Sequence, residues 1–189
     1  MNTYNDIELM ICVASRIFED GASVSVGTGI PCAAVMLAQK LYAPNILITF
    51  EAGAVAPVLP AMPISVGDST TMHKALQTGS TCDQMEMIQR GLIDYCFLGG
   101  AQIDAYGNIN STVIGDYKKP KVRFPGSGGA NDFASMAWRI VMVVPHSIRR
   151  FTNKIDFITT PGYLTGPGAR EQAGLPPNTG PYKIITNLA

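Results

Sequence analysis

The sequence is poor in charge and in histidine, and each shortage excludes a class of function. Asp, Glu, Lys and Arg together make up 15% of the 189 residues, and 14 acidic side chains balance 14 basic ones. This balance gives no electrostatic reason for binding nucleic acid or an anionic membrane. His73 and His146 stand alone without a partner at metal-ligand spacing, so the sequence predicts no metal site.

Long apolar runs and closely spaced cysteines are also missing. No stretch of about 18 apolar residues exists, so the sequence predicts no membrane-spanning helix. Residues 1–10, MNTYNDIELM, contain acidic residues and no basic segment, unlike a signal peptide. Cys12, Cys32, Cys82 and Cys96 are widely spaced, and we interpret them as reduced, mostly buried thiols of a cytoplasmic protein.

Apolar residues, by contrast, are abundant enough for one sizeable core. They make up 47% of the chain, and a chain of 189 residues is long enough to bury them in a single domain. The sequence contains no internal repeat and no linker that would divide it. We therefore expect one domain over residues 1–189.

The first half of the chain alternates predicted helices and strands. Apolar spacing predicts a helix over 5–19, a strand over 23–26, a helix over 32–42 with Pro31 at its first turn, and a strand over 46–50. Helices that alternate with strands through tight glycine loops are typical of parallel sheets. We therefore expect an α/β fold, an open and mostly parallel sheet with helices on both faces.

In the second half of the chain, the sequence predicts more strands than helices. Residues 57–71 and 159–181 are rich in proline and glycine and are expected to be irregular. The remaining predictions are a helix over 82–92 and strands over 94–100, 110–115, 121–124, 139–145, 154–159 and 182–186.

A carboxylate ends one of the predicted apolar strands. Ile46 to Phe50 lead directly to Glu51, and the small residues Ala52 to Ala54 follow. Glu51 is either a surface carboxylate at a strand end or a partly desolvated nucleophile with room for a substrate carbonyl beside it. Ligands of open α/β sheets bind beyond the carboxyl ends of the strands, which is where Glu51 stands.

Glycine-rich stretches follow three other predicted strands. Residues 27–29, Gly-Thr-Gly, either wrap an anion at a helix start or form a plain tight turn. Residues 99–100 are a glycine pair, and residues 125–132, PGSGGAND, form either an oxyanion hole of exposed amides or a flexible hairpin. A parallel sheet would gather these stretches at the edge where Glu51 lies.

Two further patterns carry less weight. Arg149 and Arg150, with Lys154 nearby, either hold a phosphate or form a solvated edge. The sequence contains no G-x-S-x-G motif, so it does not predict a serine-triad hydrolase.

Seven motifs spread over nearly the whole chain resemble a known family. The chain is similar to the β subunits of family I CoA-transferases, most closely to those of the glutaconate CoA-transferases. The matching stretches are VGTGIP with YAPN, the Glu-x-Gly at 51–53, SVGD at 65–68, GGAQIDAYGNINSTVIGDY at 99–117, GSGGAND at 126–132, RRFTNKIDFITTPGYLTGPG at 149–168 and GLPPNTGP at 174–181.

The resemblance implies a fold, a site and a partner. It implies the open α/β fold that these transferases share with some sugar-phosphate isomerases. The catalytic glutamate falls on Glu51, and the oxyanion donors fall on Gly128 and Gly129. The active site would lie where this β subunit meets a separate α subunit, which supplies much of the coenzyme A surface, in an assembly of αβ pairs.

The remaining glycine positions receive roles from their places at predicted strand ends and at a predicted helix start. We assign Gly99 and Gly100 to substrate binding, and Gly27 and Gly29 to the binding of coenzyme A. The coenzyme A thioester is the substrate, and no metal, redox group or permanently bound cofactor is expected.

The implied reaction moves coenzyme A between carboxylic acids through a covalent glutamyl-CoA thioester, with glutaconate or a related short acid as substrate. Two alternatives stay open: a CoA-thioester hydrolase or decarboxylase on the same scaffold, and a non-catalytic ligand-binding subunit.

Two departures from the family stand out. The chain ends before the family's usual C-terminal segment. The stretch EAGAVAP at 51–57 is smaller and more apolar than the usual continuation, which favours a less polar acyl chain than a dicarboxylate.

Overall fold

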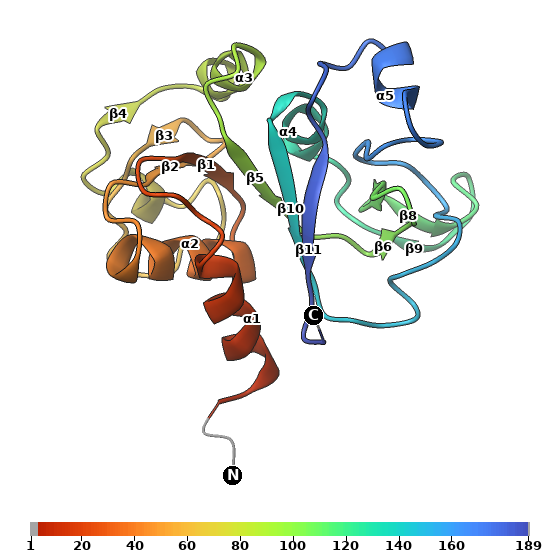
Figure 1. Cartoon of the computed structure of the whole chain (residues 1–189), viewed down its shortest axis with the longest axis horizontal. Helices are drawn as coiled ribbons and strands as arrows, with labels where there is room; N and C mark the ends of the chain where they lie inside the picture. The colour runs from red at the N-terminus through yellow and green to blue at the C-terminus, as the bar shows by residue number, and fades with distance from the viewer. Residues whose placement is uncertain (1–3, 189) are drawn as a thin grey trace.

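The computed structural model describes residues 4–188, and a seven-stranded sheet forms the centre of the described part (Figure 1). Its strands follow the spatial order β11-β10-β5-β1-β2-β3-β4. They are β1 (Ser23–Val26), β2 (Leu47–Thr49), β3 (Ala54–Val55), β4 (Gln77–Thr78), β5 (Tyr95–Leu98), β10 (Arg139–Val143) and β11 (Pro181–Ile185).

The sheet is parallel except at one edge. Strand β1 pairs in parallel with β2 and β5, and β10 pairs in parallel with β5 and β11. Strands β3 and β4 extend the sheet beyond β2 in antiparallel fashion. The expected open, mostly parallel sheet is therefore confirmed.

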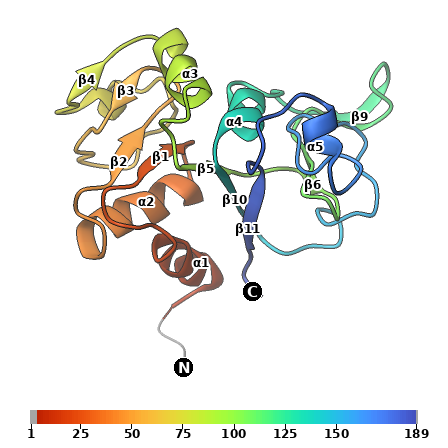
Figure 2. The ribbon, with the colours of Figure 1, turned by 45° about the horizontal axis from the view of Figure 1, so that its top comes forward.

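Helices cover both faces of the sheet, as expected. Helices α1 (Asp6–Ser15) and α2 (Ile30–Leu41) lie on one face, and α3 (Thr81–Gln89) and α4 (Ala130–Met136) lie on the other (Figures 1 and 2). Successive residues of a strand point to opposite faces. In β5, accordingly, Tyr95 and Phe97 pack with α1 and α2, whereas Cys96 and Leu98 pack with α3 and α4.

Beside β1, the order in which the chain adds strands to the sheet reverses, although the strands stay parallel. From β1 it passes through α2 to β2 on one side, and it later returns to β5 on the other side. The carboxyl ends of β1 and β5 therefore flank a topological switch point, where open α/β sheets bind their ligands.

Smaller elements lie beside β10 and β11, at the right of Figure 1. Two antiparallel pairs join β6 (Gln102–Ile103) to β7 (Ile109–Asn110) and β8 (Val113–Gly115) to β9 (Pro120–Arg123). A four-residue helix, α5 (Ala169–Gln172), follows. Within residues 4–188, no helix is long and apolar enough to span a membrane.

Arg170 of α5 holds the proline- and glycine-rich C-terminal segment in place. Its side chain is 1% exposed and donates to four backbone carbonyls and one hydroxyl. Two of the carbonyls, those of Ala134 and Ser135, lie in the last turn of α4, where helix carbonyls lack helical partners and favour a cation. The segment thus supports α4 from its C-terminal end.

Some sequence predictions do not hold. Residues 154–159 form no strand, because Asp156 is tied to Gln102 and Gly115 through side-chain hydrogen bonds instead of a ladder. The segments expected to be irregular contain α5 and the 3₁₀ helix η1 (Ser69–Met72).

Two of the four cysteines are buried and two are exposed. Cys32 and Cys96 are buried, and burial raises the pKa of both thiols, that of Cys32 to about 11. Cys12 and Cys82 are exposed, so the prediction of mostly buried thiols is wrong for these two.

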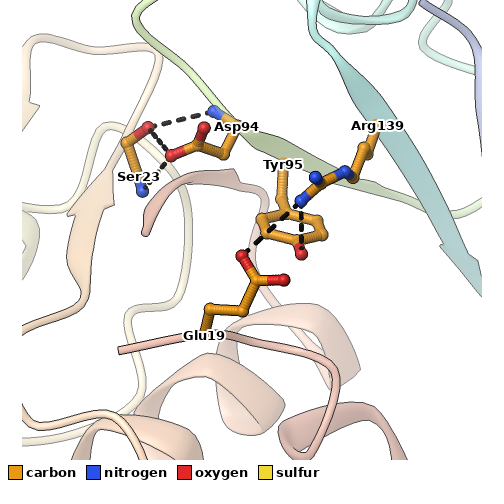
Figure 3. Close-up of polar contacts among 5 residues, drawn as sticks. All are labelled: Glu19, Ser23, Asp94, Tyr95 and Arg139. Atoms are coloured by element: carbon orange, nitrogen blue, oxygen red, sulfur yellow. Dashed lines mark hydrogen bonds and ion pairs between the residues drawn. The ribbon is translucent and has the colours of Figure 1, made fainter. Parts of the chain in front are cut away.

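A polar cluster fixes the starts of β1, β5 and β10 (Figure 3). The Ser23 N–H donates to the Asp94 carboxylate at 2.9 Å, and the Asp94 N–H donates to the Ser23 hydroxyl oxygen at 3.0 Å. Arg139 donates to the Tyr95 hydroxyl at 2.7 Å and lies 3.7 Å from Glu19. These contacts set the relative position of the three strands, and the opposite ends of two of them, β1 and β5, border the switch point.

We expect the Asp94 carboxylate to stabilise the fold more than the exposed Glu19 carboxylate. Replacing Asp94 with Ala leaves the Ser23 N–H without its acceptor and should lower the free energy of unfolding by about 1–3 kcal/mol. Glu19→Gln should change it by less than about 0.5 kcal/mol, because Glu19 is 73% exposed. Urea unfolding followed by circular dichroism measures both, and equal effects would contradict this ranking.

Candidate active site

A cavity of about 280 Å³ opens at the switch point, beyond the carboxyl ends of β1, β2 and β5. We name it the Glu51 cavity. Ser25 and Gly27 contribute from β1 and its following loop, Glu51 from the end of β2, and Gly99 from the end of β5. Gly128, in the loop before α4, completes this part of the wall.

Glu51 and the glycine-rich loop meet in this cavity. The Gly129 N–H donates to Glu51 Oε2 at 3.0 Å, although the two residues are 78 positions apart in the sequence. The carboxylate is half-buried. The sheet edge thus joins the candidate nucleophile to a backbone donor of the kind that stabilises developing negative charge.

Steric constraints require glycine at this contact. A Cβ atom on Gly129 would lie 2.6 Å from Glu51 Oε2 and 2.8 Å from the methyl carbon of Met85, closer than side chains tolerate. Gly128 has a φ of 52°, and its Cβ would lie 3.7 Å from Glu51 Oε1. At Gly129 the backbone can therefore approach the carboxylate as it does only because it carries no side chain, whereas at Gly128 it is the positive φ that favours glycine.

The small residues after Glu51 allow the chain to turn closely against its own backbone after β2. Gly53 has a φ of 115°, and a Cβ on it would lie 2.0 Å from the Gly79 carbonyl oxygen. The Gly79 N–H donates to the Gly53 carbonyl at 2.9 Å. Ala52 to Pro57 do not line the Glu51 cavity. The structure therefore places none of these residues in the wall of this cavity, and the expectation of a less polar acyl chain stays a prediction.

The loop between β3 and β4 forms another wall through Val66. Asp68 holds this loop by accepting from the Ile64 N–H at 3.0 Å and the Thr70 N–H at 2.9 Å. The hydrogen bond from Ile64, followed by those from Thr70, lowers the pKa of Asp68. The carboxylate is therefore ionised at neutral pH, and its bonds weaken as the pH falls through the lowered pKa.

The other predicted positions do not all lie in the Glu51 cavity. Gly27 and Gly99 line the Glu51 cavity, whereas Gly29 does not and is exposed at the N-cap of α2. Gly100 lines a neighbouring cavity of about 440 Å³ together with Arg150, whose guanidinium donates to the Gly100 carbonyl. The two cavities share Gly99, Ser111 and Gly126.

Several lining residues had no sequence signal that singled them out. Ser25 belongs to an alternating strand pattern, and Phe97 belongs to an apolar strand. Thr28 stands between two glycines that attracted attention only for their backbone. Among the described residues, none that lines the Glu51 cavity is Lys, Arg or His.

Known proteins are similar to this chain over nearly its full length. The model of the family described as Coenzyme A transferase matches residues 7–188. One subunit of the 3-oxoadipate CoA-transferase of Pseudomonas knackmussii is 40% identical over all of this chain and 72% of its own length. One subunit of the glutaconate CoA-transferase of Acidaminococcus fermentans is 40% identical over 97% of this chain and 71% of its own length.

Solved structures agree with the sequence matches. The crystal structure of glutaconate coenzyme A-transferase from Acidaminococcus fermentans superposes with a TM-score of 0.94 and 38% identity, over 98% of this chain and 73% of that chain. A variant of the decarboxylase AibA/AibB superposes with a TM-score of 0.77 and 27% identity, over 83% of this chain and 67% of that chain.

We expect removal of the Asp68 carboxylate to loosen the loop that carries Val66. Asp68→Ala removes the acceptor for the Ile64 and Thr70 N–H groups, so the loop should open more often and trypsin should cleave after the exposed Lys74 several-fold faster at pH 7. Asp116→Ala is the matched control, because Asp116 accepts only within its own turn. An unchanged cleavage rate in Asp68→Ala would show that this carboxylate does not order the loop.

Proposed function

The chain belongs to the coenzyme A transferase family, and from that membership we propose that it moves coenzyme A between short carboxylic acids through a covalent thioester on Glu51. The contact between Glu51 Oε2 and the Gly129 N–H carries the proposal. It joins a carboxylate to an amide donor inside a cavity at the switch point, and both positions are those that the family resemblance implied. Residues 4–188 would act as one domain in this role.

The first half-reaction transfers the acyl group to the enzyme and then releases it. A Glu51 oxygen attacks the thioester carbonyl carbon of an acyl-CoA, the C–S bond breaks, and the coenzyme A thiolate leaves an acyl-glutamyl anhydride. The thiolate then attacks the Glu51 carbonyl carbon. The anhydride C–O bond breaks, the first acid departs as its carboxylate, and a glutamyl-CoA thioester remains.

The second half-reaction reverses these steps with another acid. Its carboxylate attacks the glutamyl thioester, which expels the thiolate and forms a new anhydride. The thiolate attacks the new acyl carbonyl, giving the second acyl-CoA and a free Glu51 carboxylate. Each step is an acyl transfer in which atoms and electrons balance, so the reaction consumes no redox equivalent and calls for no permanently bound cofactor.

The position of the Gly129 N–H favours one particular role. It donates to an oxygen of Glu51 itself, so it would hold the oxyanion that forms when the thiolate attacks the Glu51 carbonyl carbon. Gly128, at which a Cβ would lie 3.7 Å from Oε1 and 3.8 Å from Oε2, would assist it. Gly27 and Gly99 would contact the substrate, because both line the same cavity. Gly29 and Gly100 lie just outside it and would act on neighbouring parts of the coenzyme.

The names of the relatives support a second subunit and a substrate class. Two relatives at 40% identity are each named as one subunit of an enzyme, so we propose that this chain works with a separate partner subunit, as expected from the resemblance. The same names support an acid related to glutaconate or 3-oxoadipate as substrate.

We expect Glu51→Gln to abolish both turnover and covalent capture of coenzyme A. The chain assembled with its partner subunit is incubated with an acyl-CoA and then reduced with borohydride, which converts a glutamyl thioester at residue 51 to an alcohol. Mass spectrometry should find the reduced residue in the wild type and not in Glu51→Gln, because an amide is a poor nucleophile.

The same incubation separates the alternative activities. A thioester hydrolase releases free coenzyme A without an acceptor acid, and a decarboxylase releases carbon dioxide. A ligand-binding subunit does neither. Turnover in the wild type without any modification at Glu51 would contradict the covalent route.

We expect Gly129→Ala to reduce kcat by about 100- to 1000-fold, the usual cost of losing an oxyanion donor. The new Cβ would displace the Glu51 carboxylate or the loop, because it would lie 2.6 Å from Oε2. Gly67→Ala is the control, since a Cβ at Gly67 meets no atom within 4 Å. If both variants kept full activity and the fold of the wild type, the Gly129 amide would have no role in the reaction.

A further inference from the structure

The glycine-rich loop before α4 has few fixed points. Residues 125–129 include three glycines, and Gly126 and Gly128 have φ angles of 98° and 52°. Such a backbone is freer than that of other residues, so contacts with the rest of the chain must fix it. Among the described residues, three hydrogen bonds join residues 125–131 to parts of the chain outside this loop and α4. One of them is the bond from Gly129 to Glu51 itself.

The other two hydrogen bonds both lead to Thr159. On one side of the loop, the Gly126 N–H donates to the Ser111 carbonyl at 3.1 Å, and the Ser111 N–H donates to Thr159 Oγ1 at 2.8 Å. On the other side, the Asn131 side-chain amide donates to the Thr159 carbonyl at 2.9 Å. Thr159 therefore holds both ends of the loop, one through its side chain and one through its backbone.

Thr159 is itself firmly placed and lies away from the cavity. It is 3% exposed, its N–H donates to the Ile109 carbonyl of β7 at 2.9 Å, and its hydroxyl bonds to that of Thr112 at 2.7 Å. It does not line the Glu51 cavity, whereas Ser111, which it holds, does. Thr159 thus links the loop to β7 without reaching the place where a substrate would lie.

We propose that Thr159 is a positioning residue for the reaction at Glu51. Its hydroxyl and its carbonyl, through the two links just described, keep the Gly129 N–H at hydrogen-bonding distance from the carboxylate. Thr159 acts through that amide and touches neither the substrate nor the reacting atoms. The inference rests on the proposed function, because it takes the Gly129 N–H to be the oxyanion donor.

Thr159→Val tests this role in the chain assembled with its partner subunit. Valine keeps the branched shape of threonine but leaves the Ser111 N–H without its acceptor, so the loop loses one of its two links. The kcat should fall by about 10- to 100-fold, as expected when an assisting group is slightly misplaced. Thr159→Ser keeps the hydroxyl and should retain kcat within about threefold.

Thr160→Val provides the matched control. Thr160 is the adjacent threonine and is 1% exposed, but its hydroxyl has no hydrogen-bond partner among the described residues and does not line the Glu51 cavity. This variant should keep the kcat of the wild type. Circular dichroism and gel filtration verify that each variant is folded and assembled. Equal losses in Thr160→Val and Thr159→Val, or full activity in Thr159→Val, would overturn the inference.

A double variant separates positioning from a general effect on the structure. If Thr159 acts through the Gly129 amide, Thr159→Val should lower kcat by less than about twofold in a chain that already carries Gly129→Ala, because the effects of coupled residues do not add. A structural effect independent of this amide would lower kcat by the same factor in both backgrounds. That result would also overturn the inference.

Covalent capture separates this inference from the proposed function. Borohydride reduction should still modify Glu51 in Thr159→Val, but more slowly than in the wild type, because the nucleophile is intact and only its amide partner is displaced. Equal capture rates in the two proteins refute the role of Thr159 alone. Failure of capture in the wild type refutes the covalent function, on which the inference depends.

Discussion

The hydrogen bond from the Gly129 N–H to Glu51 Oε2 is the contact on which the candidate site depends. It joins the turn after β2 to the loop before α4, and it determines where the carboxylate lies in the cavity. The contact requires a residue without a side chain, because Met85 and Phe133 fill the space around Gly129. Arg170 supports the same helix from its other end. Remote parts of the chain therefore determine the position of one carboxylate.

The electrostatics of the cavity follow from the backbone more than from charged side chains. Within residues 4–188, Glu51 is the only ionisable residue that lines it, and the other polar groups are hydroxyls and backbone amides. Amide donors fixed in a fold need little reorganisation when negative charge develops, so they suit a reaction that forms oxyanions in succession. A neutral lining also keeps Glu51 free of a competing ion pair, which would lower its nucleophilicity. Binding of the remote parts of coenzyme A would then supply the energy that a weak carboxylate nucleophile needs.

The sequence predicted most of the sheet because its strands are short apolar runs bounded by glycine, proline or charge. Tyr95 to Leu98 and Arg139 to Val143 are examples in which local composition was sufficient. The prediction failed for residues 154–159, where Asp156 bonds to distant partners, and for β3 and β4, which are too short to show a period. The small residues after Glu51 suggested room for a substrate. The structure instead shows that Gly53 is required by the Gly79 backbone.

The sequence by itself determined the class of fold, the place of Glu51 at a strand end and the stretches of glycine that could expose amides. These features depend on neighbours in the chain, which a linear pattern records. Only the tertiary structure decided that Gly129 meets Glu51, that Gly29 and Gly100 lie outside their cavity and that the Ser25 hydroxyl has no partner among the described residues. Strand order and register bring residues 78 positions apart into contact, and neither is encoded in local spacing.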